Sequence, residues 1–197
     1  MSTIEFEAFP KIARLNRGMV ITEKIDGTNA AVVITEDGEI GAQSRSRLIT
    51  PEADNYGFAG WVQRNANLLV EILGPGRHFG EWWGSGIQRK YGLSGSDKRF
   101  SLFNSARWNV EADGFDRVAG LGVVPVLHTG PFDNASINAV VTMLGAGGSI
   151  AAPGFMRPEG VVVFQVASRT MFKVTVDGDA APKGAAGHAL DNEKVSA

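Results

Sequence analysis

The chain has 197 residues, of which 44% are hydrophobic and 20% are charged, and these values fit one compact domain with a buried core. It contains no cysteine, which excludes a disulfide framework and a zinc site made of cysteine thiolates. The formal net charge of -2 excludes a global attraction to nucleic acid, so any phosphate binding must come from a local cluster of basic residues.

The first third of the chain is predicted to be extended. Residues 1–10 indicate an edge strand or an arm, without the basic segment and apolar core of a signal peptide. The stretch MVITEKIDGTNAAVVITEDGEIGAQS is rich in β-branched residues and predicts strands separated by turns. Its Asp26-Gly27 pair is typical of a hairpin bend. Residues 52–73 then place apolar side chains at helical spacing, and Gly74-Pro75-Gly76 ends that helix.

The rest of the chain predicts further strands and a second helix. The strands are HFGEWW, FSLFN, VVPVLHTG, EGVVVFQVAS and TMFKVTV. Residues 134–146 predict a helix with Asn134 or Ser136 as its N-cap, and the composition of residues 177–197 predicts a flexible tail. Because the strands follow one another as hairpins instead of alternating with helices, we expect an α+β fold of antiparallel sheets flanked by helices. No apolar run reaches the roughly 18 residues of a membrane span, so we expect an intracellular, cytoplasmic protein with no membrane partner.

Two lysines stand out chemically. Lys24 ends an apolar strand, where partial burial disfavours the charged ammonium. Burial would therefore favour the neutral amine, which can act as a nucleophile. A surface lysine beside a turn is the alternative, because Lys-x-Asp-Gly alone is a weak motif. Lys173 lies within another apolar strand, where an unpaired charge is costly. A bound phosphate would provide its partner.

Six segments in this order, EKIDGTN, SRSR, FGEWWG, FSLFN, EGVVV and FKV, resemble the motif set of the covalent nucleotidyltransferases. That superfamily comprises the ATP-dependent RNA and DNA ligases and the mRNA capping enzymes, and the chain is most similar to RNA ligases of the bacteriophage RNA ligase 2 type. The resemblance covers about residues 4–176. It implies a nucleotidyltransferase (ATP-grasp-like) adenylation domain over residues 1–176, followed by the tail and with no room for an OB-fold.

The resemblance also implies a role for each site residue. Lys24 would attack the α-phosphate of ATP to form lysyl-AMP, Glu159 would act through a bound Mg²⁺ ion or its waters, and Lys173 would hold the α-phosphate. Phe103 would stack on adenine and Glu81 would bind the ribose. The complete implied nucleotide-binding set is Glu23, Ile25, Asp26, Asn29, Arg45 (with Arg47 as an alternative), Glu81, Phe103 and Val162.

The implied activity is ATP-dependent RNA ligation. AMP would pass from Lys24 to the 5′-phosphate of RNA, with DNA as an alternative substrate, and a 3′-hydroxyl would then seal the break. A phage-encoded repair enzyme fits this role. The alternatives are a DNA ligase, a GTP-dependent capping-type enzyme and a non-catalytic binding module of the same fold. The basic, glycine-rich loop 84–99 either contacts phosphates of the nucleic acid or is a solvated loop.

Three features depart from the family pattern. Asn104 stands where the family usually has aspartate. Thr175 stands where it usually has a second lysine, for which Lys183 is a candidate substitute. The chain also ends soon after its last motif, where related enzymes continue into a further domain.

Overall fold

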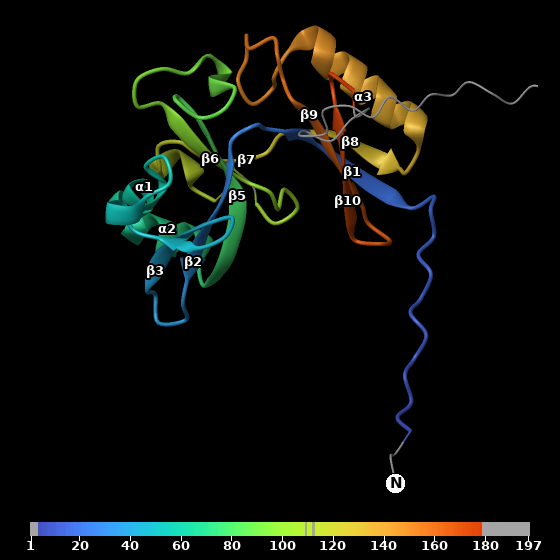
Figure 1. Ribbon diagram of the computed structural model, residues 1–197, viewed down its shortest axis with the longest axis horizontal. Helices are drawn as coiled ribbons and strands as arrows, with labels where there is room; N and C mark the ends of the chain where they lie inside the picture. Colours follow the sequence, from blue (N-terminus) through green and yellow to red (C-terminus); the bar gives the residue numbers. More distant parts are fainter. Residues whose placement is uncertain (1–3, 109, 112, 179–197) are drawn as a thin grey trace, which may run out of the picture.

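The computed structural model describes residues 4–108, 110, 111 and 113–178, and it divides into two lobes (Figure 1). The smaller lobe is a four-stranded sheet in the order β10-β9-β1-β8, and the larger lobe is a six-stranded sheet in the order β4-β3-β2-β5-β6-β7. Among the described strands every pairing is antiparallel except that of β6 with β7.

The smaller lobe is built from β1 (Gly18–Lys24), β8 (Val126–Pro131), α3 (Asn134–Gly147), β9 (Gly160–Gln165) and β10 (Thr170–Thr175). The larger lobe is built from β2 (Thr28–Ile34), β3 (Ile40–Ser44), β4 (Leu48–Ile49), α1 (Phe58–Arg64), α2 (Ala66–Leu73), β5 (Gly76–Gly84), β6 (Lys98–Leu102) and β7 (Leu121–Val123), with the short 3₁₀ turns η1 (Pro51–Ala53), η2 (Lys90–Gly92) and η3 (Phe115–Arg117).

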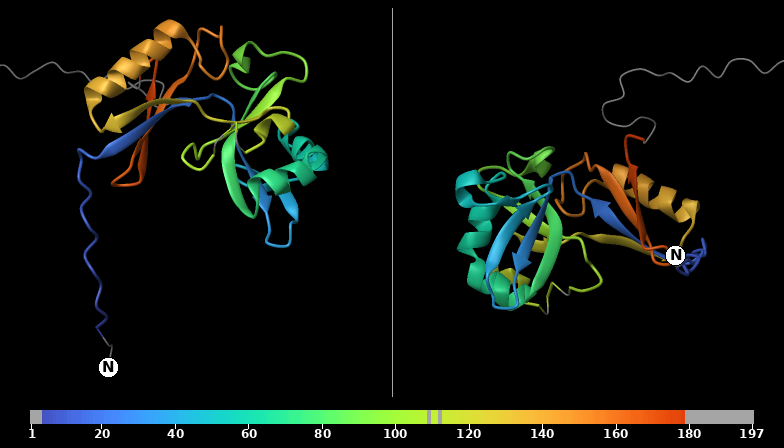
Figure 2. Two further views of the ribbon diagram at one scale, coloured as in Figure 1. Left: turned by 180° about the vertical axis from the view of Figure 1, so that it is seen from behind. Right: turned by 60° about the horizontal axis from the view of Figure 1, so that its bottom comes forward.

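Helices cover one face of each sheet (Figures 1 and 2). In the larger lobe, alternate residues of β2 such as Val32 and Ile34 are buried with residues of α1 and α2. In the smaller lobe, Val161 and Val163 of β9 are buried against α3. Successive side chains of a strand point to opposite faces, so the residues between these core positions lie on the uncovered faces of the two sheets.

The chain crosses between the lobes directly after Lys24. The predicted hairpin at Asp26-Gly27 is wrong, because β1 and β2 do not pair and instead belong to different sheets. Gly27 is required for close approach: a Cβ there would clash with the carbonyl oxygen of Trp82. A local Asp-Gly signal cannot distinguish a bend that returns the chain from one that passes it to a second sheet.

A third core joins the two lobes. Its buried members come from the crossing segment, β5, η2, the segment before β8 and the loop after α3, and they are Ile25, Trp83, Tyr91, Val124 and Ala152. The site described below lies beside this core.

Several local predictions are corrected by the structure. The predicted helix over residues 52–73 is split into η1, α1 and α2. The N-cap of α3 is Asp133, not Asn134 or Ser136, and its carboxylate accepts a hydrogen bond of 2.7 Å from the Ser136 N–H. Residues 4–10 form an exposed arm and no strand, and the arm projects away from both lobes (Figure 1).

No helix in the described ranges is long and apolar enough to cross a membrane. The predicted tail lies outside the described residues from position 179 onward, and so does Lys183.

Candidate active site

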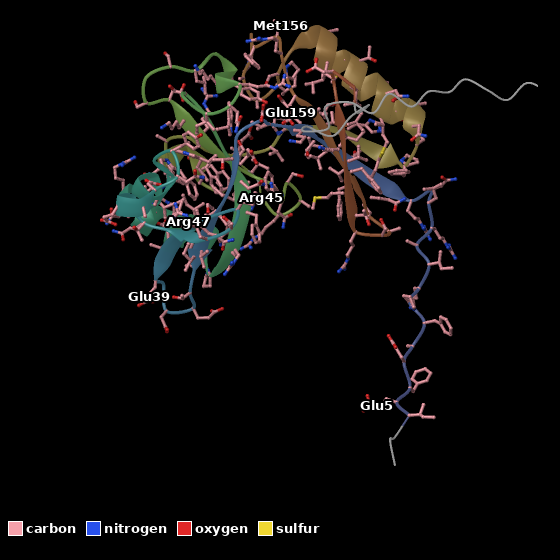
Figure 3. All side chains as sticks on the ribbon, viewed as in Figure 1. Glu5, Glu39, Arg45, Arg47, Met156 and Glu159 are labelled. Atoms are coloured by element: carbon pink, nitrogen blue, oxygen red, sulfur yellow. The ribbon has the colours of Figure 1, made fainter. Side chains whose placement is uncertain are left out.

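Lys24 and Glu159 form an ion pair where the two lobes meet. The Lys24 Nζ lies 2.7 Å from a carboxylate oxygen of Glu159. The register of the sheet produces this contact, because Lys24 ends β1 opposite Gly160, the first residue of β9. Glu159 precedes that strand, and Figure 3 shows it beside the passage of β1 toward the larger lobe. The side chains are 27% and 7% exposed, so the lysine remains accessible while its partner is buried.

Glu81 of β5 approaches the same point from the larger lobe. One of its carboxylate oxygens accepts a hydrogen bond of 3.0 Å from the Gly27 N–H. Burial, together with the charges of Glu159 and Asp26, raises the pKa of Glu81 to about 7, against the opposing effects of the Gly27 hydrogen bond and the Lys24 charge. Glu159 and Glu81 therefore approach the Lys24 ammonium from the two lobes, while the Asp26 carboxylate is paired with Arg89.

Asp26 is held by two residues of the loop before and within η2. Its N–H donates to the Tyr91 hydroxyl at 2.8 Å, and its carboxylate accepts from the Arg89 Nε at 3.1 Å. Arg89 also donates to the carbonyl oxygens of Arg157 and Pro158, directly before Glu159. These contacts fix the segments on either side of the ion pair. We call Lys24, Asp26, Glu81, Arg89 and Glu159 the junction.

The uncovered face of the larger sheet carries polar and aromatic side chains. Asn29 of β2 lies directly opposite Glu81 of β5, and directly opposite residues of antiparallel strands share a face. The Phe103 N–H donates to the Phe79 carbonyl at 3.0 Å, which continues the β5–β6 pairing and makes these two aromatic residues neighbours. Phe79 is 51% exposed and Phe103 is 40% exposed. We call Asn29, Phe79 and Phe103 the open face.

The uncovered face of the smaller sheet carries Val162 and Lys173. These residues lie directly opposite each other in β9 and β10, on the same face as Lys24, because their strand neighbours pack against α3. Lys173 is exposed. Thr175 lies opposite Gly160, which in turn lies opposite Lys24, so Thr175 and Lys24 occupy one row of the sheet with only a glycine between them.

Glu23 and Ile25 point to the opposite side from Lys24. The Glu23 carboxylate accepts hydrogen bonds from the Ser149 hydroxyl at 2.5 Å and from two backbone N–H groups, those of Ile150 and Ala151, at 2.9 and 2.8 Å. Ile25 is buried in the core between the lobes. Neither side chain lies on the uncovered sheet faces, so the structure does not bring them together with Phe103 and Val162 as the sequence predicted.

Arg45 and Arg47 lie in the turn between β3 and β4 (Figure 3). Arg47 donates to the Ala53 carbonyl at 3.1 Å, which gives it a structural role. Within the described part of the chain, no hydrogen bond or ion pair engages the Arg45 guanidinium. Of the two, Arg45 is therefore the one free to bind a ligand.

Sequence reasoning missed Phe79 and the roles of Arg89 and Tyr91. The alternation of Phe79, Glu81 and Trp83 was an available signal for Phe79, since it places all three on one face of β5. No local signal exists for Arg89 or Tyr91, because their contacts join residues more than 60 positions apart.

Solved structures with similar folds include RNA ligases from Naegleria gruberi. A lysine-to-methionine variant with AMP and manganese has a TM-score of 0.60 and 21% identity, over 83% of this chain and 51% of that one. A lysine-to-alanine variant with ATP and manganese has a TM-score of 0.57 and 20% identity, over 82% and 50%. An aspartate-to-alanine variant without ligand has a TM-score of 0.58 and 21% identity, over 82% and 50%. The chain spans about half the length of these relatives.

This likeness confirms the predicted α+β fold of antiparallel sheets flanked by helices. A search of curated proteins gave no match. A family model described as RNA ligase matches residues 17–175, which include every strand and helix of both lobes. The chain belongs to the RNA ligase family.

Proposed function

We propose that this chain is an ATP-dependent RNA ligase that forms lysyl-AMP on Lys24, transfers AMP to a 5′-phosphate and seals that phosphate to a 3′-hydroxyl. The observation that carries the proposal is the contact of 2.7 Å between the Lys24 ammonium and the Glu159 carboxylate, in a chain of the RNA ligase family. The ion pair provides a nucleophile that remains accessible and a buried group that can take its proton.

The positions substituted in the Naegleria structures support this assignment of residues. In that chain a substituted lysine and a substituted glutamate are 57 residues apart, at positions 170 and 227, as Lys24 and Glu81 are here. A substituted aspartate lies two residues after that lysine, at position 172, as Asp26 follows Lys24. A further glutamate and lysine are 14 residues apart, at positions 312 and 326, which is the spacing of Glu159 and Lys173.

In the first step Lys24 acts as the nucleophile. Its Nζ forms a bond to the α-phosphorus of ATP, the bond from that phosphorus to pyrophosphate breaks, and the ammonium proton is lost. Glu159 is within hydrogen-bond distance of Nζ and is the acceptor for that proton. Lys173, on the same uncovered face, would stabilise the negative charge on the α-phosphate. With Thr175 in the other expected position, one cation serves where related enzymes use two.

The nucleotide would lie between the uncovered faces of the two sheets. Phe103, with Phe79 beside it, offers an exposed aromatic surface for adenine, and Val162 offers an apolar surface on the other sheet. The Glu81 carboxylate has a second oxygen available for a ribose hydroxyl, and Asn29 lies opposite it. Glu23 and Ile25 would act indirectly, by fixing the strand that presents Lys24.

The described residues fit a divalent cation only in part. No group of three or more histidine, aspartate or glutamate side chains within the described ranges is arranged to hold a metal. A Mg²⁺ ion would therefore be held by phosphate oxygens together with Glu159, the usual manner for this ion. When bound, it would neutralise charge on the phosphates.

The remaining steps use the same residues. An oxygen of the 5′-phosphate attacks the phosphorus of AMP, the bond to Nζ breaks, and Lys24 regains its proton. The 3′-hydroxyl then attacks the activated 5′-phosphate, a phosphodiester bond forms, and AMP leaves. Charge neutralisation by Lys173 and Arg45 serves both transfers.

Self-adenylylation tests the proposal. The protein is incubated with Mg²⁺ and α-labelled ATP or GTP and separated on a denaturing gel. We expect label from ATP only, its loss in Lys24→Ala, and its retention in Lys11→Ala, a matched control on the exposed arm. Label from GTP instead would indicate a capping-type enzyme, and no label from either nucleotide would indicate a non-catalytic module. Sealing of nicked RNA but not nicked DNA is the expected outcome of the second assay.

A further inference from the structure

A basic cavity lies beside the junction, formed by the loop before and within η2 and by the segment that leads into β9. Its volume is about 400 Å³, and it is lined by Gln88, Arg89, Lys90 and Arg157. Among the described residues, the lining therefore combines three cations with one amide and includes no carboxylate. Like charges held close together repel each other, so an anion is the ligand that this cavity favours.

Arg89 connects the cavity to the reacting residues. Its guanidinium donates to the carbonyl oxygens of Arg157 and Pro158, at 3.1 and 3.5 Å, and Glu159 follows immediately. The carboxylates that face Arg89 are Asp26 and Asp177, at 3.1 and 3.5 Å. Because both carboxylates are already paired with it, the Arg89 guanidinium is held in place and its charge is neutralised. Arg89 therefore lines the cavity without offering an unpaired charge to a ligand.

The free charges are those of Lys90 and Arg157. Both residues are exposed, and among residues 4–108, 110, 111 and 113–178 neither side chain has a hydrogen-bond or ion-pair partner. They come from two different segments, one from η2 and one from the stretch before Glu159, and both line the cavity.

The backbone of the loop holds Lys90 in place. Gln88, Lys90 and Tyr91 have φ values of 44°, 60° and 50°, a conformation that residues with side chains rarely adopt. Such conformations persist where the surroundings fix them. Here the Tyr91 ring is buried against Trp83 and Phe155, and its hydroxyl accepts from the Asp26 N–H. The backbone from which the exposed Lys90 side chain projects is thus set before any ligand binds.

We propose that Lys90 and Arg157 form a phosphate-binding subsite next to the Lys24–Glu159 pair, with Gln88 as an additional donor. The inference rests on the proposed function, which supplies two sources of phosphate: the backbone of the polynucleotide and the pyrophosphate end of ATP. A tetrahedral phosphate has enough acceptor oxygens for an ammonium, a guanidinium and an amide at once. The subsite therefore acts in binding and not in the chemical step.

Equilibrium binding tests this without turnover. The full chain, the double variant Lys90→Gln with Arg157→Gln and a control double variant Lys11→Gln with Arg64→Gln are compared. Both pairs remove two positive charges, and the control residues are exposed and belong to the arm and to α1, not to the segments that line the cavity. The probes are a 5′-phosphorylated single-stranded RNA, measured by fluorescence anisotropy over a range of salt concentrations, and inorganic pyrophosphate, measured by calorimetry.

If the polynucleotide is the source, the cavity variant loses about tenfold in RNA affinity and its salt dependence becomes shallower by about one unit of slope, while pyrophosphate binding is unchanged. If ATP is the source, pyrophosphate affinity falls and RNA affinity does not. Equal behaviour of the cavity and control variants toward both probes would overturn the subsite. Failure of self-adenylylation in the unsubstituted chain would instead overturn the ligase proposal, and the binding data would remain interpretable.

Discussion

The junction and the open face differ in how complete they are without a ligand. At the junction, each charged group already has a partner: Lys24 with Glu159, Asp26 with Arg89, and Glu81 with the Gly27 N–H. On the open face, Phe79 and Phe103 are about half exposed. A preformed charged centre needs little reorganisation energy during phosphoryl transfer. An aromatic surface, in contrast, contributes binding free energy only when a base stacks on it. The junction should therefore govern rate, and the open face should govern nucleotide affinity.

The largest expected effect comes from breaking the junction at its centre. Glu159→Gln should lower the rate of lysyl-AMP formation by about 10² to 10⁴, the usual contribution of a positioned acid or base, with little change in the ATP concentration needed for half-maximal rate. Single-turnover labelling at varied ATP measures both quantities. Glu36→Gln, in an exposed turn, is the control. A rate within threefold of the unsubstituted chain would remove Glu159 from the chemistry.

The next largest effect is expected on folding stability, from removal of the Glu23 carboxylate that fixes the strand carrying Lys24. Glu23→Ala leaves two backbone N–H groups and the Ser149 hydroxyl without their buried acceptor, which should cost about 3 kcal/mol in the free energy of unfolding. For a chain of this size, that loss lowers Tm by roughly 10 °C. Thermal unfolding monitored by circular dichroism provides the measurement, with the exposed Glu39→Ala as control. Similar melting of the two variants would show that Glu23 has no supporting role.

The pH dependence of stability probes the contribution of the larger lobe to the junction. Because the pKa of Glu81 is raised to about 7 in the folded chain from an ordinary value near 4.5, the folded state holds the proton more tightly than the unfolded state. The stability linked to this group is fully present below about pH 4.5 and is lost as the pH rises through about 7.

The matching measurement is chemical denaturation of the unsubstituted chain and Glu81→Gln at pH 5 and pH 8. The difference in unfolding free energy between the two proteins should change by about 2 kcal/mol across this range, with the unsubstituted chain losing stability relative to the variant. A constant difference would mean that Glu81 stays ionised throughout.

The smallest effect is expected on the open face, and it should appear in affinity alone. Phe103→Ala should weaken ATP binding by about tenfold, and Phe79→Ala by somewhat less, as expected when one stacking surface for a base is removed. Phe172→Ala is the matched control, since Phe172 is 47% exposed but packs toward Phe132 on the other face of its sheet. A fall in the rate at saturating ATP would contradict the division between the two regions.

Most strands could be predicted from the sequence because β-branched residues and alternation act locally. The crossing at residues 25–27 could not, because Asp-Gly supports a bend whatever sheet the next strand joins. The proximity of Lys24 and Glu159 could be predicted only from the order of the motifs along the chain, since the two residues are 135 positions apart. The orientation of Glu23 could not be predicted, because a strand carboxylate next to a reactive lysine gives no sign that a distant loop supplies three donors to it.

The crossing itself has a mechanical consequence. Lys24 is the last residue of the smaller sheet, and only Ile25, Asp26 and Gly27 separate it from the first strand of the larger one. Each of these three residues is fixed, by the core between the lobes, by Arg89 and by Glu81. The chain crosses back to the smaller lobe through residues 124 and 125, between β7 and β8. Because two short crossings and a shared core tie the lobes together, the place of the lysine relative to the larger sheet is fixed before any phosphate arrives.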